Sequence, residues 1–469
     1  MRYDRQRCLP GVPGPAEEGK NMQHSGASAD AQYIKMAQTP VARLILTLAV
    51  PTIISMLATS IYNTADTYFV SRLGTSASGA VGIVFALMAF YQAVGFMCGQ
   101  GSGSFVSRLY GEKKPEDAKV YGNSAFLMSM ILGLCISILG MLFLEPLLRI
   151  LGSTKTILPY AKQYAVWILL AGPFLSASCT LNNLLRYEGR AFYAMIGLTT
   201  GGLLNIAGDP LFMFGLGFGA AGAGISTALS QIVSFLILLF TFFTDRTVME
   251  FSPSYISRAA KIYTSVIRVG SPSLLRQGLN ALSTILLNRA AMQYGDAAIA
   301  AMSIVGRLAF LMGAIGIGIG QGLQPVASFN YGAGKYDRVK KGTYFTAAAG
   351  TAVLTALGLV MFSFARPIIT WFRDDPEVIA IGTDALRWQC FASMFQTISM
   401  TGNMLFQSIG KARQAFFLAS LRTGLFFIPL ILILPQVFGV TGIEIAQPVS
   451  DILTAAVSVI IAGRFLRRL

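Results

Sequence analysis

Charged residues are scarce in this sequence, and long apolar runs take their place. Of its 469 residues, 12% are Asp, Glu, Lys or Arg and 54% are hydrophobic, and the mean hydropathy is +0.61. Water-soluble globular proteins carry a charged fraction of about 25%, so that class is excluded. Apolar runs of roughly 20–28 residues recur along nearly the whole chain, and each can cross a bilayer as a helix. The composition therefore predicts an all-α membrane protein with about twelve transmembrane helices.

Histidine and phosphate-binding loops are absent from the apolar runs. The single histidine, His24, lies in the polar N-terminal segment, which excludes His-based catalysis or metal binding inside the membrane. No GxxxxGK[ST] phosphate loop is present, so no ATP site of that kind is expected. We therefore expect a protein that is not an enzyme and that needs no cofactor.

Cysteine is also rare, and its pattern indicates no chemistry. The five cysteines are odd in number, contain no CxxC pair, and lie within apolar runs with the exception of Cys8. Neither a disulfide framework nor a metal site is indicated. We interpret these cysteines as packing residues.

The formal net charge of +15 reflects topology more than a binding partner. When twelve spans are drawn, roughly two thirds of the 36 Lys and Arg fall in segments on the same side as the N-terminus. Because positive charge stays on the cytoplasmic side, this asymmetry predicts an integral protein of the cell membrane with both termini in the cytoplasm. We expect contacts with membrane lipid, but no nucleic acid and no obligate protein partner.

The chain repeats itself at an offset of 221 residues, which places Pro51 on Pro272 and Gly74 on Gly295. Further identities at this offset are Gln100/Gln321, Ser107/Ser328, Gly111/Gly332 and Asn182/Asn403. The repeat predicts two six-helix lobes of the same orientation, related by an axis along the membrane normal. Substrate sites in such folds lie between the lobes.

The repeat also divides the chain. We predict a disordered, cytoplasmic N-terminal tail over residues 1–43, an N-lobe with the cation site over 44–250 and a C-lobe over 251–469. The third and ninth spans are expected near 121–148 and 343–370.

Asp66 is the most costly residue of the first span. A carboxylate at this depth costs about 2.5–3.5 kcal/mol on insertion scales. Its counterpart in the second copy is Leu287, so the acid occurs in only one half of the repeat. A costly acid in one copy of a duplicated segment indicates function.

Two further polar residues are expected at the same depth as Asp66, on the fifth and sixth spans, and a third is expected one turn deeper. Counting at 1.5 Å per residue places Asp66, Asp209 and Thr227 roughly 9–10 Å below the outer surface. Asn205 lies one turn from Asp209, on the same helix face. Hard oxygen ligands suit a small cation such as Na⁺, and neighbouring carboxylates also take up protons because like charges repel. The alternative is a satisfied polar network in which Asp209 bonds to a neighbouring helix.

The other candidate residues are less specific. Pro51 is a candidate hinge, although its presence in both copies also fits a shared scaffold kink. Asp451 is the remaining deep acid, with a coupling or a structural role. Polar residues of span seven are candidates for the cavity lining: Arg276, Gln277 and Asn280.

Four motifs together resemble the multidrug and toxic compound extrusion (MATE) family. They are VP…D…RLG from Val50, LNxxxDPLF, GxxGAGISTALSQ and GQGLQPVASFNYGAGKYDRVKK, within a likeness that covers about residues 40–465. The resemblance implies twelve helices in two lobes and drug export in exchange for Na⁺ or H⁺. In the branch with a first-lobe cation site, the motif positions fall on Asp66, Asn205, Asp209 and Thr227. Span seven lacks the acid of the other branch, so no second-lobe coupling site is expected.

These observations predict a secondary active antiporter for multidrug efflux, a function associated with antibiotic resistance. It would exchange amphipathic, cationic organic compounds for Na⁺ or H⁺ by alternating access of the two lobes. The alternative is a flippase for lipid-linked saccharides or phospholipids, which needs several cations in its cavity. Only Arg276, Arg307 and Arg422 lie within spans, against the deep acids of the first lobe, and this favours cation-coupled export.

Overall fold

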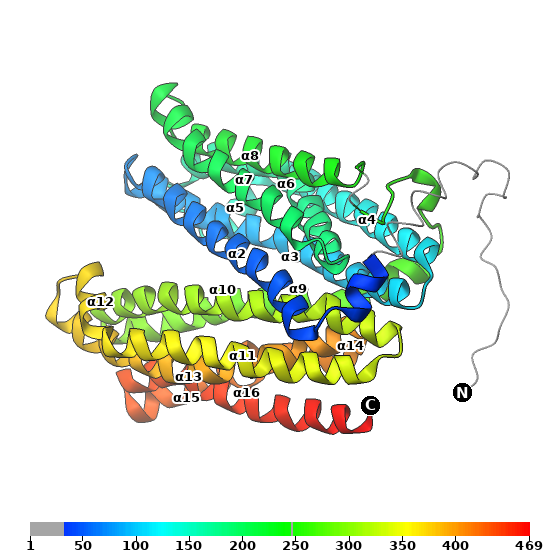
Figure 1. Ribbon diagram of the computed structural model, residues 1–469. Coiled ribbons are helices and arrows are strands. Elements are labelled where there is room, and N and C mark those ends of the chain that lie inside the picture. The colour runs from blue at the N-terminus through cyan, green and yellow to red at the C-terminus, as the bar shows by residue number, and fades with distance from the viewer. Residues whose placement is uncertain (1–31, 245–246) are drawn as a thin grey trace.

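Long helices form nearly all of the regular structure in the computed structural model, which describes residues 32–244 and 247–469. No strand occurs in these ranges. The first half contains α2 (Val41–Ser71), α3 (Thr75–Gly111), α4 (Pro115–Leu142), α5 (Leu144–Ile150), α6 (Leu158–Tyr187), α7 (Ala191–Pro210), the π-helical turn η1 (Leu211–Gly215) and α8 (Gly219–Thr241). Figure 1 shows these helices as one layer of the molecule.

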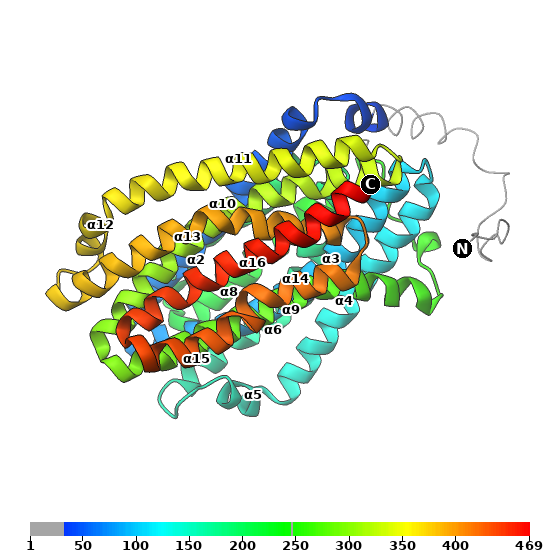
Figure 2. The ribbon, with the colours of Figure 1, turned by 90° about the horizontal axis from the view of Figure 1, so that it is seen from below.

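The second half forms the other layer of Figure 1 and faces the viewer in Figure 2. After the 3-10 turn η2 (Pro253–Tyr255) it contains α9 (Ala260–Ala291), η3 (Met292–Tyr294), α10 (Asp296–Gly332), α11 (Tyr336–Ser363), α12 (Ala365–Phe372), α13 (Pro376–Ser408), α14 (Ala412–Ser420), the π-helical turn η4 (Leu421–Leu425), α15 (Phe427–Phe438) and α16 (Val440–Arg468). The predicted lobe boundary after residue 250 falls in the segment between α8 and α9.

Ten helices of the described ranges are long and apolar enough to cross a membrane. In this count α7 continues through η1, and α14 continues through η4 and α15. Two more helices, α9 and α13, are 32 and 33 residues long but carry more polar and charged residues. Together they form the all-α, twelve-helix membrane fold that the sequence predicts.

The third and ninth spans begin and end earlier than the sequence predicts. In α4 the helix begins in the polar loop, because Pro115 suits the first turn and Glu116 and Asp117 favour the positive end of the helix dipole. The helix then breaks at Phe143, whose ψ of 34° is not helical, and α5 follows separately. The second half repeats this break at Phe364, between α11 and α12.

The predicted disordered tail is wrong for its last part. Residues 32–38 are helical, and α2 already begins at Val41. Met36 is only 1% exposed, and the ring of Tyr33 packs edge-on against Phe329 of α10 at 5.2 Å. Tertiary contacts therefore order this polar segment. Residues 1–31 lie outside the described residues.

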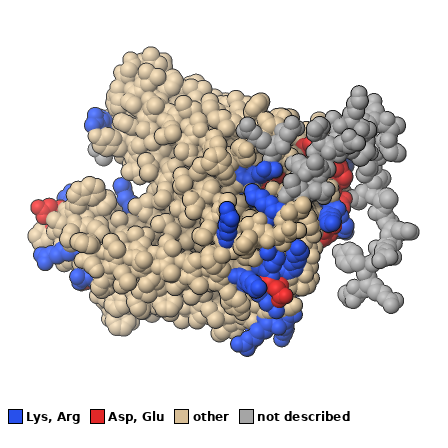
Figure 3. Space-filling model, viewed as in Figure 1, with Lys and Arg blue, Asp and Glu red and all other residues tan. Residues whose placement is uncertain are grey.

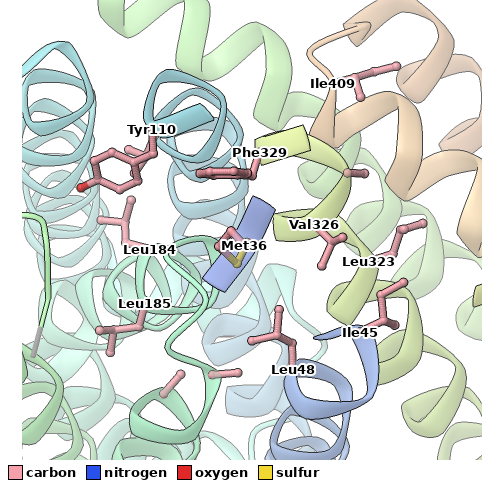
Figure 4. Packing of buried hydrophobic residues seen from close by; sticks show 14 of the residues in the cluster. Met36, Ile45, Leu48, Tyr110, Leu184, Leu185, Leu323, Val326, Phe329 and Ile409 are labelled. Carbon is pink, nitrogen blue, oxygen red and sulfur yellow. The ribbon is translucent and has the colours of Figure 1, made fainter. Parts of the chain in front are cut away.

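The two halves share one large hydrophobic core at the end of the bundle where the C-terminus lies, and a smaller cluster in which Val266 of α9 packs among residues of α3 and α4. Figure 4 shows part of the large core, with Ile45 of α2 close to Leu323 of α10, and with Leu48 of α2, Leu184 of α6 and Phe329 of α10 in the same cluster. Two further cores each contain residues of one half alone, one around Tyr91 and Tyr164 and the other around Leu308 and Leu386. The halves are thus joined at one end, which we call the closed end, and have separate cores towards the other, the open end.

Reciprocal contacts between α3 and α10 hold the closed end together. Ser107 donates a hydrogen bond to the carbonyl of Pro325 at 3.1 Å, and Ser328 donates one to the carbonyl of Ser104 at 2.8 Å. These two bonds are related by the repeat, because both members of each pair are displaced by 221 residues. Such self-complementary pairing is typical of a contact across a two-fold axis.

Glycine allows the two helix backbones to approach this closely. A Cβ atom added to Gly332 would lie 2.1 Å from the carbonyl oxygen of Arg108, and one added to Gly111 would lie 2.1 Å from that of Phe329. Arg108 completes the contact, since its Nη1 donates to the carbonyl of Ile409 at 3.0 Å.

The space-filling view shows a notch between the two halves at the open end (Figure 3). The same view shows that most Lys and Arg side chains gather at the closed end. The molecule therefore has a cleft that opens at the end with fewer cations.

Glu188 joins three segments at the closed end, one residue beyond α6. Its Oε1 accepts hydrogen bonds from the Tyr110 hydroxyl at 3.1 Å and from the backbone N–H of Met249 at 2.8 Å, while Oε2 has no partner among the described residues. Burial raises the pKa of Glu188 to about 7, although these bonds and the nearby Arg190 oppose the shift. The folded protein therefore binds this proton more tightly than an exposed glutamate does.

We expect Glu188 to make stability depend on pH. The folded protein holds the Glu188 proton more tightly than the unfolded chain, so stability falls as the pH rises from about 4.5 to about 7, by up to about 3 kcal/mol. Thermal unfolding of the wild type at pH 5 and pH 8 should show this loss, and Glu188→Gln should remove most of it. Glu112→Gln is the control, because Glu112 is an exposed acid at the same, closed end of the molecule. An unchanged pH dependence in Glu188→Gln would contradict the expectation.

Gly332→Ala should wedge the closed end apart. The added methyl cannot be accommodated against the Arg108 backbone, and overpacking of this kind costs about 1–3 kcal/mol. Spin labels at the exposed positions Asp117 and Asp337 should report a longer distance, together with a lower melting temperature. Gly306→Ala is the matched control, because it lies on the same helix with no atom within 4 Å of the new Cβ. Identical distances in both variants would refute the tight contact.

Candidate functional site

The four residues predicted for cation binding lie together inside the first half. Asp66 comes from α2, Asn205 and Asp209 from α7, and Thr227 from α8. All four are buried, and Asp66 and Asp209 are 8% and 0% exposed. The depth expected from the sequence thus corresponds to a real cluster on three helices.

Asn205 is the central donor of this cluster. Its Nδ2 lies 3.1 Å from Asp209 Oδ1 and 3.1 Å from Thr227 Oγ1, so it connects α7 with α8. Ser226 adds a second link by donating to the carbonyl of Asn205 at 3.2 Å. These contacts hold one side of the cluster in place without a charged partner.

Tyr164 of α6 connects Asp66 to the rest of the cluster. Its hydroxyl lies 3.3 Å from Asp66 Oδ2 and 3.4 Å from Thr227 Oγ1. The sequence reasoning missed this residue, although the same depth count would have found it, since Tyr164 lies six residues after Leu158 at the start of α6. A tyrosine in an apolar span carries no conspicuous cost, so nothing singled it out. Ser226, next to Thr227, was missed for the same reason.

Three oxygens of the cluster remain without a donor. Asp66 Oδ1, Asn205 Oδ1 and Asp209 Oδ2 are buried and have no hydrogen-bond partner among the described residues. No salt bridge within those residues involves either aspartate. Buried acceptors left unpaired are costly, and more so when they carry charge. The donor set of two carboxylates, an amide oxygen and a hydroxyl fits a proton or a small hard cation.

Pro210 shapes the backbone next to Asp209. Proline has no N–H to donate, so it removes one hydrogen bond of the helix. The chain continues from Pro210 into the π-helical turn η1, an element that occurs often at functional sites. The local irregularity therefore lies directly beside one of the two buried acids.

Asp451, the remaining candidate acid, is paired. Arg422 contacts both of its carboxylate oxygens, with Nε 2.7 Å from Oδ1 and Nη2 3.3 Å from Oδ2. Gln447 also donates to Oδ1 at 2.8 Å. The bidentate pair satisfies this carboxylate, and it lies in the second half, away from the first-half cluster.

The candidate cavity residues Arg276, Gln277 and Asn280 lie on α9, also in the second half. Arg276 and Gln277 are partly exposed, and Asn280 is exposed. Arg276 Nη1 donates to Asn403 Oδ1 of α13 at 3.2 Å. These residues form a group separate from the acid cluster.

Pro51, the candidate hinge, lies within α2, and its repeat counterpart Pro272 lies within α9. Close by, Ala49 and Ile53 pack against Gly322 and Gly318 of α10. Pro51 therefore lies where α2 contacts the second half.

Comparisons with known proteins agree with this architecture. The MatE family profile matches residues 51–211 and 272–433, one range in each half. The multidrug export protein MepA of Staphylococcus saprophyticus is 25% identical over 433 residues, which cover 92% of this chain and 96% of that protein. An FAD transporter of Shewanella oneidensis is 24% identical, with coverages of 92% and 96%.

Solved structures give the same result. A crystal structure of MATE in complex with MaL6 superposes with a TM-score of 0.88 at 25% identity, covering 93% of this chain and 98% of that one. An outward-facing multidrug resistance MATE transporter of the MOP superfamily gives 0.88 at 24% identity, with the same coverages. The chain therefore belongs to the MATE family of integral membrane transporters.

Proposed function

We propose that this transporter exports amphipathic organic compounds of several types in exchange for Na⁺ or H⁺. Relatives of similar length are named multidrug export proteins, which supports the substrate breadth. The observation that carries the coupling is the trio of buried, unpaired oxygens on Asp66, Asn205 and Asp209. A proton or a cation in this position would supply the missing partner and compensate one of the two negative charges.

The distribution of charge supports one orientation of the molecule in the membrane. Lys and Arg gather at the closed end (Figure 3), and positive charge stays on the cytoplasmic side of membrane proteins. With the closed end and the C-terminus in the cytoplasm, the cleft faces outwards. Outside cations then reach the first half while substrate leaves from the cleft.

Helix α2 is suited to connect the two events. It carries Asp66 towards the open end, and its Ala49 and Ile53 contact α10 nearer the closed end. Pro51 lies between Ala49 and Ile53 and provides a place for the helix to bend. Cation binding would draw α2 towards α7 and α8 and thereby change its contact with the second half.

Asp66→Asn should abolish cation-driven export while the protein stays folded. The amide keeps the shape of the side chain but carries no negative charge to attract a cation. The driving ion therefore loses its effect on α2. Transport of ethidium into proteoliposomes under an imposed Na⁺ or pH gradient measures this, and we expect a loss of at least about 100-fold, or about 2.7 kcal/mol. The gradient that drives the wild type identifies the ion.

Asp296→Asn serves as the control, because this acid lies at the start of α10 outside the cluster. Size-exclusion profiles and melting temperatures of both variants establish folding. Full gradient-driven transport by Asp66→Asn would refute the coupling assignment.

Tyr164→Phe should make the site bind its cation more tightly. The lost hydroxyl lies within hydrogen-bond distance of Asp66 Oδ2, and a hydrogen bond to a charged group is worth about 1.5–3 kcal/mol. Without it the carboxylate is less satisfied and attracts a proton or a cation more strongly. The half-saturating ion concentration for transport should therefore fall about tenfold.

Tyr91→Phe is the matched control for this change. Tyr91 is also fully buried in the first half, but its hydroxyl bonds to Ser137. A raised half-saturating concentration in Tyr164→Phe, or an equal change in both variants, would contradict the proposed role.

A further inference from the structure

Three arginines near the contact of the two halves lack an acidic partner. Arg276 bonds to the Asn403 amide oxygen, Arg186 to Gln321 and Asn183, and Arg108 to backbone carbonyls. No salt bridge within the described residues includes any of them. By contrast, Arg422 is paired with Asp451. Arg108 still interacts electrostatically with Glu112, but no acid of the described residues acts in this way on Arg186 or Arg276.

The three arginines share one electrostatic neighbour. Tyr187, at the end of α6, interacts electrostatically with all three of them. Its hydroxyl is buried and has no hydrogen-bond partner among the described residues. The cluster thus combines unpaired donors with uncompensated cations.

Arg276 is the member of this cluster that reaches the cleft. Helix α9 contacts α3 through Gly270, whose Cβ would meet the Met97 backbone, and through Ser273, which bonds to Gln100 at 2.5 Å. Arg276 lies one turn beyond Ser273 towards the open end and is partly exposed. Two residues further, a Cβ on Gly278 would meet no atom within 4 Å. Arg276 therefore lies just beyond the contact of α9 with α3, on the side where the notch of Figure 3 opens, and we call this position the floor of the cleft.

The helices that hold the halves together, α9 and α10, carry little negative charge. Between Ala260 and Gly332 the only acid is Asp296, at the outer end of α10. Towards the open end from Arg276, the same two helices add Arg289 and Arg307, both exposed. The deep acids Asp66 and Asp209 are buried within the first half, so they do not neutralise this side.

Arg276 is held in position by a fixed partner. Asn403 Nδ2 donates to the carbonyl of Ala415 at 2.6 Å, which leaves its Oδ1 directed to the guanidinium. The repeat counterpart Asn182 makes the same backbone bond to Ala194, but the residue that corresponds to Arg276 is Ser55. The arginine is thus an addition of the second half and not part of the shared scaffold.

We infer that Arg276 binds an anionic group, a carboxylate or a phosphate, on the amphipathic substrate. A guanidinium with one nitrogen fixed presents its remaining N–H groups as a fork that suits such a group. The adjacent Gln277 and Asn280 offer neutral amides on the same helix. This inference rests on the proposed function and changes the expected substrate from a simple cation to a zwitterion or an anion.

Two forms of one dye test this substrate class. Tetramethylrhodamine has a free carboxylate, and its methyl ester is the corresponding cation. Fluorescence polarisation with the purified full-length protein measures their dissociation constants without any ion gradient. We expect the wild type to bind the free acid at least tenfold more tightly than the ester. Equal affinities, or a preference for the ester, would overturn the inference.

Variants locate the effect. Arg276→Gln should bind both forms equally, and Arg276→Lys should keep at least a threefold preference for the acid because the positive charge remains. Arg289→Gln is the matched control, with the same charge change on the same helix about 20 Å away, and it should behave as the wild type. A preference retained in Arg276→Gln, or lost equally in Arg289→Gln, would refute the role of Arg276. If Arg276→Gln does not fold, the Arg276→Lys and Arg289→Gln results still decide.

Two further measurements separate this inference from other outcomes. Gradient-driven transport of the ester by wild-type proteoliposomes tests the proposed function alone, since it needs no carboxylate on the substrate. Dihexanoylphosphatidylglycerol tests a lipid headgroup as the source of the anion. We expect it to displace the dye only at concentrations at least tenfold above the dissociation constant of the acid. Tighter displacement would assign Arg276 to a phospholipid and overturn the assignment to a soluble compound.

Discussion

The contact between α3 and α10 at the closed end determines the form of the whole molecule. In lipid no hydrophobic force draws helices together, so close backbone packing and hydrogen bonds must hold them. Here the bonds from Ser107 and Ser328 and the bare backbones of Gly111 and Gly332 provide both. Because the halves meet in this region and have separate cores beyond it, a cleft opens on the opposite side. Arg276 lies beyond a second contact of α3, the one with α9.

A symmetric scaffold thus carries asymmetric chemistry. Asn182 and Asn403 tie equivalent helices together in the two halves with equivalent bonds. The charged residues follow no such rule, because the first half alone has the buried acid pair and the second half alone has the arginine at the floor. In our proposal the coupling ion and the anionic group of the substrate therefore bind in different halves. The ion and the substrate then do not compete for one site, and α2 mechanically links the two sites.

Counting residues from the span ends identified most of the acid cluster. It placed Asp66, Asp209 and Thr227 at one depth, and the structure brings them together, although their role in coupling stays a prediction. The count missed Tyr164, since tyrosine in an apolar run costs little and attracts no attention. The predicted third span also ended too late, because the helix breaks at Phe143 and this local break in the backbone leaves no signal in hydropathy. The ordering of the helix around Met36 depends on distant contacts with α10.

The sequence by itself determined the class of protein, the duplication and the asymmetry of its charges. These properties follow from composition and from residue identity at a fixed offset, so no coordinates are needed. Only the tertiary structure decided which charges are paired. Asp451 forms an ion pair with Arg422, whereas Arg276 contacts no carboxylate among the described residues, although all three lie within apolar spans. The reason is geometric: pairing depends on how neighbouring helices are rotated and how deeply each side chain lies, and neither quantity can be derived from hydropathy or from spacing along one chain.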